Sequence, residues 1–130
     1  MREAKAELRK IVAFSEKEHE VFIENKKVEI VDFHLQNNSF YKELVGSKNY
    51  INWEDLPVLN KQNLQKPLQE RLSKGYSIKN SYINKTSGSS GTPFIFAKDK
   101  YCHALTWASN IYRFGLYGID FNTSYQARFY

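Results

Sequence analysis

Cysteine is nearly absent from this sequence of 130 residues. Cys102 is the only one, so no disulfide can form within the chain, and a reducing cytoplasm is the expected setting. Long apolar runs are absent as well, because clusters such as 21–23 and 94–97 extend over only three or four residues. Such short runs cannot form a signal peptide or a membrane span, so we expect a cytoplasmic protein with no membrane partner.

Histidine is also scarce, with three residues in the chain. His19 and His34 have no histidine or cysteine at ligand spacing, which argues against a zinc site. His103 follows Cys102 directly, yet neighbouring residues on a helix point about 100° apart and cannot pair as base and nucleophile. The sequence therefore predicts no metal site and no thiol catalysis.

The formal net charge of +5 raises the question of a nucleic-acid partner. Acidic and basic residues alternate over 14–30, as on a solvated helix face, and the later basic residues are interleaved with Gln, Leu and Pro. We therefore expect no nucleic-acid partner. Hydrophobic residues at 42% and aromatic residues at 15% indicate one folded domain with a core of its own.

The first part of the chain, residues 1–75, reads as a helical lead-in region. Apolar residues at helical spacing and the absence of proline predict one helix over 2–35. Ser39 is placed to cap a short second helix, and Asn60 to cap a brief helix at 61–65.

The second part, residues 76–130, changes character and predicts an α/β fold. Segments 76–84 and 93–98 are rich in Tyr, Ile and Phe and should form strands on either side of a Ser/Gly loop. Asp99 is a candidate N-cap for the helix that follows, and 124–130 alternates as a strand does. That alternation stops on aromatic residues, so we expect the chain to be an N-terminal fragment whose continuation is missing.

The loop between the two predicted strands is the most informative stretch. Composition alone favours a linker or a simple hairpin connection, but a linker would need an independent domain after it. The alternative is an anion-binding loop, in which glycines turn backbone N–H groups inward and short hydroxyl side chains add donors. Its glycine spacing does not match the Walker A pattern, and no lysine follows the second glycine. The candidate phosphate-binding residues are Thr86, Ser87, Gly88, Ser89, Ser90, Gly91 and Thr92.

The stretch "TSGSSGTP" resembles the phosphate-binding motif of the adenylate-forming enzymes, which include acyl-CoA synthetases, adenylation domains of peptide synthetases and luciferase. The preceding segments "NNSFYKELV" and "LPVLNK" are similar to the phenylacetate–CoA ligase-like branch, including proteins of capsular polysaccharide biosynthesis. That resemblance spans about Ile30 to Tyr130 and uses Tyr41, Leu56, Pro57 and Lys61. Many acyl-CoA synthetases have a lysine where this chain has Phe94, so no charged contact is expected there.

The resemblance implies an ATP-dependent, AMP-forming ligase that activates a small carboxylic acid, with Mg²⁺ as cofactor and coenzyme A as candidate acceptor. Residues 76–130 would then begin the AMP-binding subdomain. By resemblance the adenine, ribose, metal and catalytic lysine positions follow Tyr130, so no catalytic residue is expected within the chain, and it should be inactive alone. The alternative is a non-catalytic binding domain whose loop only connects a hairpin. Neither the acyl substrate nor the oligomeric state follows from the sequence.

Overall fold

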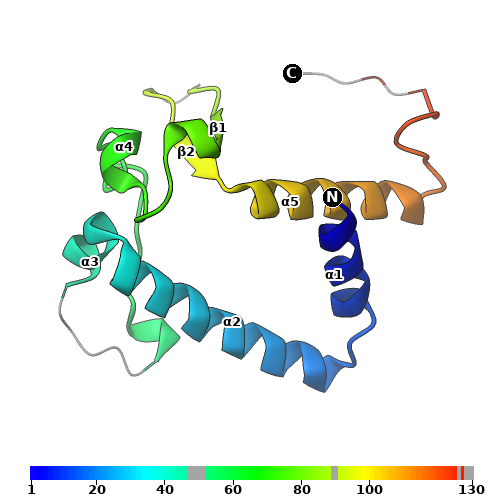
Figure 1. The fold of residues 1–130 in the computed structure, drawn as a ribbon, viewed down its shortest axis with the longest axis horizontal. Coiled ribbons are helices and arrows are strands. Elements are labelled where there is room, and N and C mark those ends of the chain that lie inside the picture. Colours follow the sequence, from blue (N-terminus) through cyan, green and yellow to red (C-terminus); the bar gives the residue numbers. More distant parts are fainter. Residues whose placement is uncertain (47–51, 89–90, 126, 128–130) are drawn as a thin grey trace. The chain divides into compact units, whose positions relative to one another are not determined.

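The computed structural model describes residues 1–46, 52–88, 91–125 and 127 (Figure 1). Within these residues the fold is mixed α/β and rich in helix, with one two-stranded antiparallel sheet. The chain divides into two compact units, one of residues 15–99 and the other of residues 1–14 and 100–130. The boundary expected at residue 75 stays a prediction. No helix in the described part combines the length and apolar composition that crossing a membrane requires.

The helix expected over 2–35 is wrong as a single element, because the chain forms α1 (Arg2–Val12) and α2 (Glu16–Asn37). Ser15 separates them through a capping box with Glu18. The Glu18 backbone N–H donates to Ser15 Oγ at 3.4 Å, and the Ser15 backbone N–H donates to Glu18 Oε2 at 2.8 Å. Hydrogen bonds from the Ser15 side chain and backbone lower the pKa of Glu18. Reciprocal capping of this kind begins a new helix, which explains the break.

The next helix, α3 (Ser39–Val45), is capped by Asn38 and not by Ser39 as the sequence suggested. Asn38 Oδ1 accepts a hydrogen bond from the Tyr41 backbone N–H at 2.8 Å. Gly46, at φ 77°, ends the helix as expected.

Short elements follow: η1 (Trp53–Asp55), α4 (Leu68–Arg71) and η2 (Ile78–Asn80). The helix expected at 61–65 is wrong, because residues 61–64 form turns. Asn60 does act as a local cap there, since its Oδ1 accepts hydrogen bonds from the backbone N–H groups of Gln62 at 2.9 Å and Asn63 at 3.1 Å.

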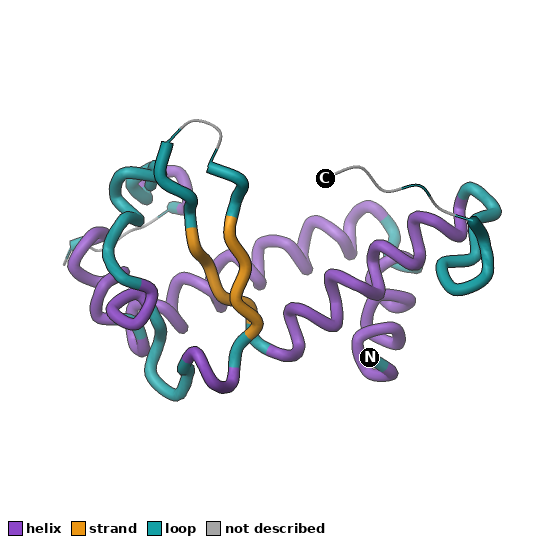
Figure 2. Tube along the Cα trace, turned by 90° about the horizontal axis from the view of Figure 1, so that it is seen from above, coloured by secondary structure: helices purple, strands orange, loops and turns teal. Residues whose placement is uncertain are grey.

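The strand predicted over 93–98 is confirmed as β2 (Ile95–Lys98), whereas of the strand predicted over 76–84 only the last residues are in β1 (Tyr82–Lys85) and residues 78–80 form η2. β1 and β2 run side by side as an antiparallel hairpin (Figure 2). The register pairs Tyr82 with Lys98 and Lys85 with Ile95. All four residues of β1 are exposed, so the hairpin has little core of its own.

A buried polar junction connects the end of α2 to the segment after α4. Asn38, 6% exposed, donates from Nδ2 to the Arg71 carbonyl at 2.9 Å and to Ser73 Oγ at 3.0 Å. The Lys74 backbone N–H donates to the Asn37 carbonyl at 2.7 Å. Because buried polar groups are costly unless paired, these bonds fix one arrangement of the two segments.

In the other unit, α1 packs against α5 (Lys100–Leu116). Small residues allow close approach, since Ala4 and Ala108 are 1% and 2% exposed. The predicted helix after Asp99 is thus confirmed. Of the strand expected over 124–130, residues 124, 125 and 127 are not in a strand, and the rest lie outside the described residues.

Candidate phosphate-binding loop

The Ser/Gly loop is closed at its base by a pair of hydrogen bonds. The Thr86 backbone N–H donates to the Phe94 carbonyl at 3.0 Å, and the Phe94 backbone N–H donates to Thr86 Oγ1, also at 3.0 Å. The Thr86 hydroxyl therefore holds the two ends of the loop together. Thr86 is one of the predicted phosphate-binding residues, and it also closes the base of the loop, whether or not it contacts a bound molecule.

Both glycines of the loop have backbone conformations that other residues adopt rarely. Gly88 has φ +73° and Gly91 has φ +122°, and the Gly91 N–H donates to the Gly88 carbonyl at 2.9 Å. A Cβ on Gly88 would lie 2.8 Å from both the Gly91 carbonyl oxygen and Pro93 Cγ. Position 88 thus requires glycine both for its φ and for the space beside Pro93.

Three of the predicted loop residues, Thr86, Ser87 and Gly88, line a pocket of about 390 Å³. This volume lies in the range of small-molecule sites. The pocket also brings in Lys61, the last residue of the "LPVLNK" segment. Two motifs that are distant in the sequence therefore meet at one cavity. The remaining lining residues are Leu59, Asn60, Leu64 and Phe94.

Gly91 and Thr92 are not among the lining residues and are exposed. Ser89 and Ser90 lie outside the described residues. Sequence reasoning did not anticipate Asn60 or Leu64 in the site. Their position within three residues of Lys61 in the chain was the available signal.

The charge around the loop is strongly positive. Between residues 57 and 99 there are six lysines and one arginine but two acidic residues, so this segment carries the whole excess of positive charge in the chain. Among the described residues of this segment, Lys66 forms an ion pair with Glu43, at 3.3 Å and largely exposed. An exposed ion pair of this kind neutralises little of the positive potential around the loop. A positive potential attracts anions.

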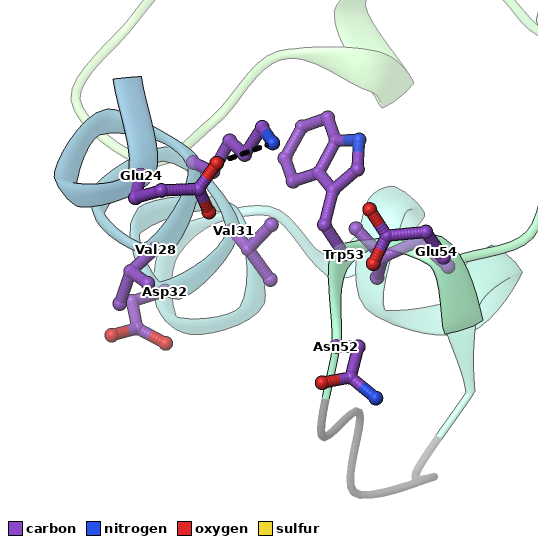
Figure 3. A pocket seen from close by; sticks show the side chains of 9 residues that line it. Glu24, Val28, Val31, Asp32, Asn52, Trp53 and Glu54 are labelled. Atoms are coloured by element: carbon purple, nitrogen blue, oxygen red, sulfur yellow. Dashed lines mark hydrogen bonds and ion pairs between the residues drawn. The ribbon is translucent and has the colours of Figure 1, made fainter. Parts of the chain in front are cut away.

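A second pocket, of about 260 Å³, lies between α2 and η1 (Figure 3). Lys27 Nζ donates to Glu24 Oε1 at 2.7 Å and lies 5.8 Å from the centre of the Trp53 ring. The hydrogen bond to Glu24 raises the pKa of Lys27. The cation of this pocket already has both a carboxylate and an aromatic partner, so the pocket offers no chemistry comparable to that of the loop.

Cys102 and His103 lie in the first turn of α5. His103 Nε2 accepts a hydrogen bond from Trp107 Nε1–H at 3.1 Å, one turn further along the helix, and Cys102 is exposed. That the two residues do not act as nucleophile and base stays a prediction. Across the described residues, no group of three His, Cys, Asp or Glu side chains is arranged to hold a metal ion.

No match to this chain is found among protein-family models, curated proteins or solved structures.

Proposed function

We propose that residues 86–92 form the phosphate-binding loop of an AMP-forming carboxylate ligase. The observation that carries this proposal is the pocket shared by Lys61 with Thr86, Ser87 and Gly88. These residues belong to the two segments on which the sequence resemblance depends. A cation beside hydroxyl and backbone N–H donors suits the oxygens of a polyphosphate.

The reaction implied is transfer of an adenylyl group. A carboxylate oxygen of the substrate forms a bond to the α-phosphorus of ATP, the bond from that phosphorus to the bridging oxygen breaks, and pyrophosphate leaves. An acceptor, for which coenzyme A is the candidate, would then form a bond from its thiol sulfur to the acyl carbon, with loss of the thiol proton. The bond from that carbon to the phosphate oxygen breaks, and AMP leaves. The loop and Lys61 would hold the β- and γ-phosphates, where negative charge develops on the leaving group. Fixed donors at such a position lower the barrier, and one of them can contribute about 2.7–4 kcal/mol.

The pocket fits a nucleotide that carries its own Mg²⁺. Mg²⁺ binds mainly through substrate phosphates and water, with one or two carboxylates. The described lining residues include hydroxyl, amide and ammonium groups but no carboxylate. In this unit Lys61, Ser87 and the loop backbone would therefore contact phosphate oxygens, and the ion would enter with the nucleotide.

The competing function is a plain hairpin connection in a non-catalytic binding domain. The Thr86 hydroxyl and the absence of a side chain at Gly88 beside Pro93 both serve the loop itself, which such a connection also needs. Ser87 and Lys61 separate the two functions. They line the pocket, and a simple connection needs neither side chain.

The test is titration of the 130-residue chain with Mg·ATP and with pyrophosphate, at constant ionic strength, by calorimetry and thermal unfolding. We expect both ligands to bind, and Lys61→Gln to weaken binding about tenfold or more, as expected for a lost charge-assisted hydrogen bond. Ser87→Ala should weaken it less. Lys79→Gln, which removes the same charge from an exposed position in η2, should change affinity by less than about twofold.

Two results would refute the proposal. The first is no binding of either ligand by the wild-type chain at millimolar concentration. The second is equal weakening by Lys61→Gln and Lys79→Gln, because the effect would then reflect net charge and not the pocket.

A further inference from the structure

We propose that Arg71 is a positioning residue that holds the Ser/Gly loop in its binding geometry. This inference rests on the proposed function of the loop. In this role Arg71 does not contact a ligand, because its side chain binds β2, the strand that follows the loop.

The hairpin needs an external anchor. A two-stranded hairpin is at best marginally stable in water. β1 is exposed at all four of its positions, and β2 has one exposed residue, three of intermediate exposure and no fully buried one. The loop can therefore keep one geometry only if its ends are held by another part of the unit, and α4 contacts β2.

The Arg71 side chain supplies that anchor through three interactions. Its Nη2 donates to the Ile95 carbonyl at 2.6 Å, and its Nε donates to the Lys66 carbonyl at 2.8 Å. The guanidinium carbon lies 5.3 Å from the centre of the Phe94 ring. Partial burial lowers the pKa of Arg71, as expected for a side chain packed against its neighbours. One planar group thus joins α4 to the first residues after the loop.

These contacts fall where the loop closes. Phe94 exchanges two hydrogen bonds with Thr86 at the base of the loop, and Ile95 pairs with Lys85 in the register. Phe94 also lines the pocket together with Lys61. A displacement of Phe94 would therefore move both the loop base and one wall of the pocket.

The other end of Arg71 is fixed in the helical part of the unit. Its backbone carbonyl accepts a hydrogen bond from the buried Asn38 side chain at 2.9 Å. The connection runs from the α2–α3 junction through Arg71 to the exit of the loop. Arg71 is not among the described residues that line the pocket, which separates its role from that of Lys61.

Lysine cannot replace this arrangement. A guanidinium can donate from two nitrogens in fixed directions and stack on a ring at the same time, whereas an ammonium is a point charge on a flexible stem. Arg71→Lys therefore keeps the charge and removes the geometry. Arg71→Met removes both, and Lys74→Met is its matched control, because it removes one charge from an exposed position three residues away.

The experiment has two measurements on the full 130-residue chain. The first is amide hydrogen exchange without ligand, at Thr86, Phe94 and Gly91. In Arg71→Lys these amides should exchange about tenfold faster or more, with α2 amides unchanged, and Lys74→Met should match the wild type. The second is the affinity for Mg·ATP and pyrophosphate as a function of salt. Arg71→Lys should weaken binding about tenfold, as expected when donors are misplaced, with an unchanged salt dependence.

The outcomes separate this inference from the proposed function. Unchanged loop exchange in Arg71→Lys, or full rescue of binding by the lysine, overturns the positioning role. A reduced salt dependence in Arg71→Met, matching that of Lys61→Gln, also overturns it, because Arg71 would then contact the phosphate itself. A wild-type chain that binds neither ligand refutes the proposed function, while the exchange data still decide whether Arg71 holds the loop.

Discussion

Replacing Asn38 tests the buried junction on which the loop-bearing unit depends. The side chain makes three hydrogen bonds, two as a donor to the Arg71 carbonyl and Ser73 Oγ and one as an acceptor from the Tyr41 N–H. A typical bond contributes about 0.5–1.5 kcal/mol, and a buried group left unpaired costs about 1–3 kcal/mol. We therefore expect Asn38→Ala to lower the free energy of unfolding by about 3 kcal/mol, including the lost helix cap.

Asn38→Asp divides this effect into its parts. Aspartate caps a helix as well as asparagine does, so the bond from Tyr41 should survive. Both donor bonds are lost, and a carboxylate oxygen then faces the Arg71 carbonyl, so at pH 7 the variant should lose about 2 kcal/mol or more. The matched control is Asn25→Asp, the same change at an exposed position of α2, which should stay within about 0.5 kcal/mol of the wild type.

The assay for these variants is urea denaturation followed by circular dichroism at pH 7. If Asn38→Asp is as stable as Asn25→Asp, the two donor bonds do not hold the junction. If Asn38→Ala loses less than about 1 kcal/mol, the junction is not a buried polar network at all.

Three further predictions have definite expected outcomes. Burial lowers the pKa of His34 below its usual 6.5, so the unfolded chain binds more protons than the folded chain. The free energy of unfolding should therefore fall as the pH drops through about 6.5. His34→Gln should show a smaller fall in the urea midpoint between about pH 7.5 and about pH 5. Gly88→Ala should distort the loop and cost about 1–2 kcal/mol or more, measured by urea denaturation, whereas Ser87→Ala should stay within about 0.5 kcal/mol. Ser15→Ala should cost about 1 kcal/mol and lower the helical signal; no change in either would contradict the capping box.

The hairpin and its loop were accessible from the sequence because their signals are local. Two short aromatic and β-branched segments around a Ser/Gly stretch predicted strand, loop and strand. β1 and β2 agree with this order, although β1 begins six residues later than predicted, after η2. The division of α1 from α2 was equally local and was missed. Ser15 and Glu18 form the capping-box pattern, but apolar spacing over 2–35 took precedence over it.

The parts that escaped prediction depend on contacts between distant segments. In the sequence Asn38 marks the end of a helix, and its neighbouring residues do not predict the hydrogen bond to Ser73. Arg71 reads as one exposed cation among several, although its guanidinium holds the Ile95 carbonyl. The pocket that Lys61 and Ser87 line also depends on two segments that are distant in the sequence. Spacing rules describe one element at a time, so pairings between elements remain outside their reach.

The net positive charge of residues 57–99, the segment that contains the loop, affects the interpretation of every binding test. Its positive residues far outnumber its acidic ones, so they repel one another, and any anion or salt should relieve part of that repulsion. A rise in melting temperature with ATP is therefore not by itself proof of a site. A ligand at 100 times its dissociation constant stabilises by about 2.7 kcal/mol, and this effect should saturate and depend on Lys61. Relief of repulsion should instead grow with ionic strength and respond equally to Lys61→Gln and Lys79→Gln.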